Sequence, residues 1–118
     1  MPDFDQLIHE DRVHRDIYTD ETIFKDEMRK IFGAVWVYLA HESQLPNIDD
    51  FFMSKLGLRP IIVTRDSSGK IRALYNRCTH RGTTICRKES GSAKAFACPY
   101  HGWTFLNSGK LEGVPWPE

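Results

Sequence analysis

The order of apolar and polar residues predicts a helix before residue 33 and β structure after it. Residues 20–32 are the helical part, with Thr19 as a candidate N-cap and Gly33 as a natural end. Apolar side chains recur there at helical spacing: Ile23, Phe24, Met28, Ile31 and Phe32. Residues 1–16 show no such period, so we expect them to form an N-terminal arm.

From residue 34 onward, short runs of strand-forming side chains alternate with turn residues. The turn sequences at 66–69 and 107–109 each predict a hairpin. Predicted strands cover residues 34–40, 51–56, 60–65, 70–76, 93–97, 103–106 and 110–112. We therefore expect a mostly β fold, an antiparallel sandwich or barrel with two projecting loops, preceded by the helix. Its core should include Trp36, Tyr38 and Phe96.

The size and charge of the chain limit what it can be. Its 118 residues suffice for one small domain, so we expect a single domain over 17–118 after the arm at 1–16. The 16 basic and 16 acidic residues cancel, and nothing indicates nucleic-acid binding. The longest apolar run, residues 31–40, is too short to span a bilayer, and the polar start lacks a signal-peptide pattern. These features predict a cytoplasmic protein without a membrane partner.

Two Cys–His pairs carry the candidate chemistry. They are Cys78-Thr-His80 and Cys98-Pro-Tyr-His101, with 17 residues between His80 and Cys98. In a Rieske [2Fe–2S] centre, two thiolates hold one iron and two imidazoles replace thiolates on the other. The four residues are therefore the candidate cluster ligands, with the cysteines on the inner iron and the histidines on the outer one. This set predicts an electron-transfer module.

Zinc is the alternative metal, because it also accepts two cysteines and two histidines. Structural zinc sites usually take two cysteines from one short segment and two histidines from another. Each motif here instead supplies one cysteine and one histidine. Gly82 and Gly102 also fit a cluster, because glycine lets main-chain amides turn toward cluster sulfurs. The third cysteine, Cys86, is assigned to packing as a small buried side chain, with an alternative ligand or a redox sensor as the other possibilities.

With Cys-Thr-His-Arg-Gly at 78–82 and Cys-Pro-Tyr-His-Gly-Trp at 98–103, the chain resembles the N-terminal Rieske domain of a ring-hydroxylating dioxygenase α (large) subunit. Residues 17–46 are similar to the helix and first strand of these subunits. The segments at 41–47 and 107–111 are most similar to the benzoate, toluate and anthranilate branch. One departure from the family pattern is the turn Asn47-Ile-Asp-Asp50, where the family commonly has a glycine before the second acid.

The resemblance implies a division of labour in a bacterial aromatic-degrading enzyme. A reductase or ferredoxin passes electrons to the Rieske cluster, which reduces a mononuclear Fe(II) in a separate catalytic domain for O₂-dependent hydroxylation. The expected partners are that donor, a neighbouring α subunit and, in some assemblies, a β subunit. The chain ends at 113–118, where the family passes into the catalytic domain, so this chain alone is expected to transfer electrons but not to hydroxylate.

Two comparisons within the wider Rieske class refine the expectation. Respiratory Rieske proteins carry an extra cysteine in each loop and a loop serine, whereas Thr83, Tyr100 and Trp103 stand at these places here. Fewer donors to the cluster predict a potential near the low end of the Rieske range, about −150 mV. The alternative function is a free-standing Rieske ferredoxin, which the chain length favours and the helix at 20–32 disfavours.

Overall fold

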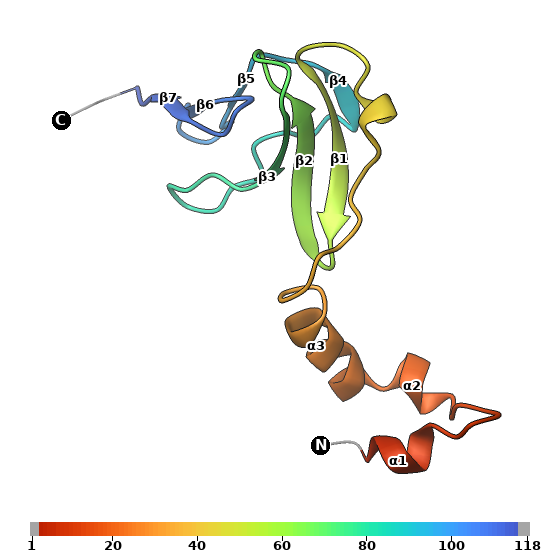
Figure 1. Cartoon of the computed structure of the whole chain (residues 1–118). Helices are drawn as coiled ribbons and strands as arrows, with labels where there is room; N and C mark the ends of the chain where they lie inside the picture. Colours follow the sequence, from red (N-terminus) through yellow and green to blue (C-terminus); the bar gives the residue numbers. More distant parts are fainter. Residues whose placement is uncertain (1–2, 116–118) are drawn as a thin grey trace. The chain divides into compact units, whose positions relative to one another are not determined.

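Two compact units, Met1–Val37 and Tyr38–Glu118, make up the computed structural model, which describes residues 3–115 (Figure 1). The boundary predicted after residue 16 falls inside the first unit. Residues 1–2 of the predicted arm and 116–118 of the C-terminal segment lie outside the described residues. Within residues 3–115, no helix is long and apolar enough to cross a membrane.

The first unit is helical. Among the described residues its helices are α1 (Phe4–Leu7), α2 (Asp16–Thr19) and α3 (Glu21–Lys30), and an isolated β-bridge joins Ile8 to Val13. The prediction of a helix at 20–32 is confirmed in α3, but the N-cap is Asp20 rather than Thr19. The Asp20 carboxylate accepts hydrogen bonds from the N–H groups of Thr22 and Ile23, which would otherwise be unpaired at the helix start.

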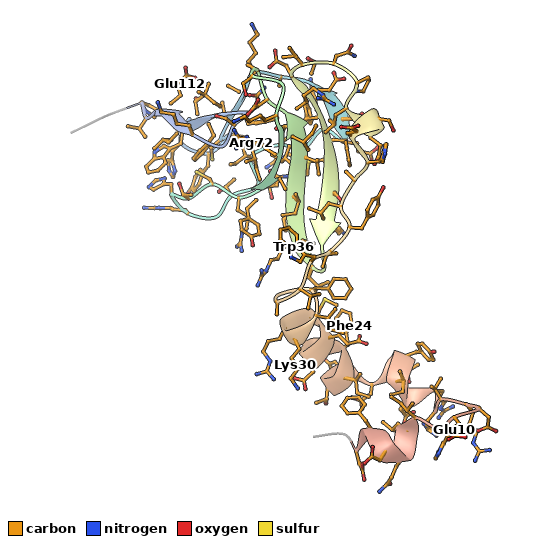
Figure 2. All side chains as sticks on the ribbon, in the orientation of Figure 1. Glu10, Phe24, Lys30, Trp36, Arg72 and Glu112 are labelled. Atoms are coloured by element: carbon orange, nitrogen blue, oxygen red, sulfur yellow. The ribbon has the colours of Figure 1, made fainter. Side chains whose placement is uncertain are left out.

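The strand predicted at 34–40 is wrong. The N–H groups of Ala34 and Val35 both donate to the Ile31 carbonyl, so turns continue past α3, and residues 36–40 then have no regular secondary structure. Trp36, labelled in Figure 2, is fully exposed and Tyr38 is largely exposed, so their assignment to the core is also wrong. A segment with strand propensity forms a strand only where another strand can pair with it, and this segment has no such partner in the described residues.

The second unit contains two antiparallel sheets. The larger has the order β3-β2-β1-β4 and the smaller the order β5-β6-β7 (Figure 1). The strands are β1 (Asp50–Leu56), β2 (Arg59–Arg65), β3 (Ile71–Tyr75), β4 (Ser90–Ser92), β5 (Ala95–Ala97), β6 (Thr104–Leu106) and β7 (Leu111–Gly113). The hairpins predicted around 66–69 and 107–109 are confirmed as β2–β3 and β6–β7. The mostly β, antiparallel fold class is therefore confirmed, with β4 as a strand that the pattern did not predict.

Strand β2 is buried on both faces and organises the core. Ile62 packs in one cluster with Phe51, Cys86 and Phe96, so the larger sheet meets β5 of the smaller one here. On the opposite face, Ile61 and Val63 pack against the segment before β1, which contains a short 3₁₀ helix at Glu42–Gln44. The Phe96 core assignment and the packing role of Cys86 are thus confirmed.

Candidate metal centre

The two loops that carry the Cys–His pairs have the same backbone hydrogen bonds. In the first loop the Cys78 N–H donates to the Thr83 carbonyl at 2.7 Å, and the Gly82 N–H donates to the Cys78 carbonyl at 2.7 Å. In the second loop the Cys98 N–H donates to the carbonyl five residues later at 2.8 Å, and the Gly102 N–H returns to the Cys98 carbonyl at 3.0 Å. One loop shape is therefore built twice, once after β3 and once between β5 and β6 (Figure 1).

A glycine with positive φ closes each loop four residues after its cysteine. Gly82 has φ 75° and Gly102 has φ 74°, in the region that side chains with a Cβ adopt only at a cost. A Cβ on Gly102 would also lie 2.9 Å from the Pro115 Cγ. The two loops differ in ligand position, since the histidine follows the cysteine by two residues in one and by three in the other.

The two cysteines of the motif lie together in the interior. Cys78 and Cys98 are both 3% exposed and pack with Phe105, while Ile85 and Trp103 border them. Burial raises the pKa of the Cys98 thiol, but hydrogen bonds from the Tyr100 and His101 N–H groups and from the Cys78 side chain lower it more. The net pKa lies below the ordinary value, which favours the thiolate that iron requires. Main-chain amides thus turn toward this sulfur, as the glycine placement predicts.

The two histidines lie together at the exposed ends of the loops. The ring centroids of His80 and His101 are 4.8 Å apart, and both residues are exposed. The pKa of His101 is lowered, first by partial desolvation of its ring and then by the charges of His80 and Arg81. A lowered pKa keeps the imidazole neutral near pH 7, and the neutral ring is the form that binds a metal.

Aromatic rings flank both imidazoles. Trp103, from the second loop, stacks on His80 of the first loop, with centroids 4.8 Å apart and planes 7° from parallel. The Tyr100 ring lies 3.8 Å from its neighbour His101, centroid to centroid. Trp103 also borders the buried cysteines, so it contacts a residue of each candidate pair.

Asn76 is a structural residue of the site that sequence reasoning missed. Its side chain is fully buried. The Asn76 Oδ1 accepts hydrogen bonds from the N–H groups of Ile85 and Cys86 at 3.0 and 2.8 Å, and the Asn76 Nδ2 donates one to the Cys86 carbonyl at 2.7 Å. Its own N–H donates to the Pro60 carbonyl. Asn76 therefore ties both ends of the first loop to β2, and only its position just before Cys78 gave any signal in the sequence.

These features fit a [2Fe–2S] cluster. A Rieske cluster takes two thiolates on one iron and two imidazoles on the other, and the two buried thiols and two exposed imidazoles are side chains of these kinds. Within residues 3–115, no group of three or more His, Cys, Asp or Glu side chains is placed to hold a single metal ion. The donor types also match, because thiolate sulfur and imidazole nitrogen are the ligands that Rieske iron takes.

Comparison with known families decides the class. The model of the Rieske [2Fe–2S] domain matches residues 35–118, which include both loops and all of the second unit. The chain belongs to the Rieske [2Fe–2S] domain family. Its cofactor is therefore a Rieske-type cluster, and the zinc alternative is not supported.

The relatives of this Rieske chain are large subunits of multi-component oxygenases. It is 49% identical over 100 residues to the 2-halobenzoate 1,2-dioxygenase large subunit of Burkholderia cepacia, a match covering 85% of this chain and 22% of that one. It is 44% identical over 120 residues to the toluate 1,2-dioxygenase α subunit of Pseudomonas putida, covering 97% and 26%. The predicted resemblance to the large subunits is confirmed, and the match disfavours a free-standing ferredoxin.

Solved structures agree with this assignment. A crystal structure of naphthalene 1,2-dioxygenase from Rhodococcus sp. superposes with a TM-score of 0.82 at 45% identity, over 87% of this Rieske chain and 23% of that chain. The chain thus spans about a quarter of the length of the relatives it matches.

Proposed function

We propose that this chain transfers electrons through its Rieske cluster as part of the large subunit of an aromatic-ring-hydroxylating dioxygenase. The observation that carries the proposal is the pair of matching loops, which bring two buried thiols and two exposed imidazoles together inside the region matched by the Rieske family. When bound, the cluster supplies one-electron redox chemistry at neutral pH.

The proposed ligands are Cys78 and Cys98 for the inner iron and His80 and His101 for the outer iron. The residues of the chain contribute three things to this centre. Burial excludes water from the thiolates, main-chain amides hydrogen-bond to the Cys98 sulfur, and the exposed imidazoles form the edge nearest to solvent. Electron transfer falls steeply with distance, so this histidine edge is the natural exit toward an acceptor.

The remaining assignments rest on the relatives. We infer that a reductase or ferredoxin donates the electrons and that a mononuclear Fe(II) in the remainder of the large subunit accepts them. A neighbouring α subunit and a β subunit are the expected partners in the oxygenase. The toluate, halobenzoate and anthranilate enzymes among the relatives support an aromatic acid as substrate. We propose the bacterial cytoplasm as the location.

The ligand assignment is tested with the third cysteine as a matched control. Iron-reconstituted protein should be red-brown and show a Rieske electron paramagnetic resonance (EPR) signal after reduction. Cys98→Ser and His101→Ala should each abolish this signal, whereas Cys86→Ser should retain it, because Cys86 packs with Phe51 and Ile62 instead. A colourless protein that purifies with zinc, or a signal that survives Cys98→Ser, would contradict the assignment.

The proposed role of the chain in delivering electrons for catalysis needs a second experiment. The complete large subunit that contains this sequence, supplied with a reductase and O₂, should consume benzoate-like acids, and His101→Ala should stop this turnover without preventing substrate binding. Substrate binding that persists without turnover separates a role in electron delivery from a role in forming the substrate pocket.

A further inference from the structure

The neutral net charge of the chain conceals an uneven distribution. Residues 38–118 contain eleven basic and seven acidic residues, which gives +4, whereas residues 1–37 contain five basic and nine acidic residues, which gives −4. The unit that carries the cluster loops is therefore cationic. A partner that meets this unit experiences its local charge rather than the total.

Part of this positive charge borders the first cluster loop. A pocket with a volume of about 690 Å³ lies between the β1–β2 turn and this loop. We name it the arginine face, and its main residues are Leu58, Arg59, Tyr75, Arg77, Cys78 and Gly82. Among the described residues that line it there is no Asp or Glu.

Both guanidinium groups of the arginine face are held by neutral acceptors. Arg59 Nη1 donates to the Tyr75 hydroxyl at 3.3 Å, and Arg77 Nε donates to the Gly82 carbonyl at 3.5 Å. Arg72, labelled in Figure 2, offers a contrast within the same sheet, because its Nε donates to the Asp66 carboxylate at 2.8 Å. Within residues 3–115, the ion pairs include neither Arg59 nor Arg77, so their charge stays available to a carboxylate from outside.

Exposed apolar surface lies beside these charges. Leu58, in the turn between β1 and β2, is 70% exposed, and Tyr75, at the end of the edge strand β3, is 56% exposed. Arginine and tyrosine beside an apolar side chain are typical of energetically important interface residues. The floor of the surface reaches Cys78, a proposed ligand of the inner iron.

We propose that the arginine face is the docking surface of the electron donor, a protein that presents acidic side chains around its own redox centre. This inference rests on the proposed function. One electron leaves the reduced donor, which is oxidised, and enters the diferric cluster, which becomes mixed-valent, with no bond made or broken. The donor approaches from the cysteine side of the first loop, so the histidine edge stays free for the acceptor.

The test uses the complete oxygenase and its reduced donor protein in stopped-flow measurements. Arg59→Glu and Arg77→Glu should each lower the second-order rate constant of cluster reduction about tenfold or more at low ionic strength. The loss should shrink at about 0.5 M salt, where screening removes steering. Arg87→Glu is the matched control, because Arg87 is exposed in the same unit and does not line the face. It should change the rate less than twofold.

Small-molecule reduction separates docking from damage to the centre. Dithionite reduction and the EPR spectrum should be unchanged in Arg59→Glu, whose side chain contacts Tyr75 rather than a loop residue. A donor rate that is insensitive to Arg59→Glu and Arg77→Glu overturns the docking surface, as does an equal loss with Arg87→Glu. A wild-type protein with no Rieske signal overturns the proposed function itself.

A labelling experiment tests whether the rest of the large subunit covers this surface. In the complete oxygenase, Leu58→Cys should react with a maleimide, and an excess of donor should slow that reaction. Protection of this position without the donor would show that the face is an internal interface and would overturn the inference.

Discussion

Trp103 stacks on His80 across the two cluster loops, with ring planes only 7° from parallel. The contact joins a residue of the second loop to a proposed ligand of the first, and Trp103 also borders the buried Cys78 and Cys98. One side chain therefore limits rotation of an imidazole and covers the cysteine side of the centre from water. Ligand orientation and solvent exposure are both properties that set the behaviour of an iron–sulfur centre.

Replacing this ring should loosen the centre. Trp103→Leu removes an aromatic pair worth about 0.5–1.5 kcal/mol, which corresponds to an about twofold to tenfold faster loss of cluster absorbance to an iron chelator. Water should also stabilise the more negative reduced state, so the reduction potential should rise. Trp103→Phe retains a stacking ring and should stay close to wild type in both measurements. Equal behaviour of the two variants would show that Trp103 acts only by filling volume.

The closing glycines should tolerate alanine poorly. In Gly102→Ala, the positive φ alone costs about 1–2 kcal/mol, and the new Cβ would approach Pro115 to 2.9 Å. Gly69→Ala is the control, because Gly69 has φ 85° in a remote turn and no atom lies within 4 Å of its Cβ position. Both variants should be destabilised in guanidinium unfolding, but only Gly102→Ala should also lose cluster occupancy. Full occupancy in Gly102→Ala would mean that the loop accommodates the side chain.

The features predicted correctly from the sequence are those encoded over short distances. The ligand candidates follow from their spacing, the β2–β3 hairpin from the turn at 66–69, and helix α3 from its apolar period. Strand β4, with the sequence Ser-Gly-Ser, has no strand-forming side chain and exists because it pairs with Asp50, Phe51 and Phe52 of β1. Such pairing is a long-range property that a local pattern does not contain.

The wrong predictions arise from the same limitation. Residues 34–40 have the composition of a strand, yet no neighbour pairs with them in the described structure, and Trp36 and Tyr38 are exposed. Their hydrophobicity indicates that burial would be favourable, but not which surface provides it. The role of Asn76 was missed for a related reason, because burial of a polar side chain depends on backbone groups about ten residues away along the chain.

Asn76 should be among the costliest residues of the site to replace. Asn76→Ala leaves two N–H groups and one carbonyl without their partner in the interior, which should lower the free energy of unfolding by about 2–4 kcal/mol. The first loop should also become mobile and exchange its amide hydrogens faster. Asn47→Ala is the control, since Asn47 is exposed and its side chain bonds only to Asp50 among the described residues. A cost below about 1 kcal/mol would indicate that water replaces the lost contacts.

The turn at 66–69 makes the stability of the second unit sensitive to acid. Hydrogen bonds from the Ser68 hydroxyl and the Arg72 guanidinium, with two backbone N–H groups, hold the pKa of Asp66 far below its usual range despite its burial. A carboxylate with a lower pKa in the folded state stabilises the protein fully above its unfolded pKa, near 4, and loses this effect as the pH falls below that value.

Asp66→Asn should therefore unfold at a lower guanidinium concentration than wild type at pH 7, because the charged acceptor is lost. The difference between the two proteins should shrink as the pH is lowered from about 4 toward 2, because the Asp66 carboxyl then becomes protonated in unfolded wild type while it stays ionised in the folded state. The measurement is a set of guanidinium midpoints over this pH range, with Glu89→Gln, an exposed acid of the same unit, as the control. A constant difference at every pH would mean that the amide disrupts the turn sterically and that the charge of Asp66 contributes nothing.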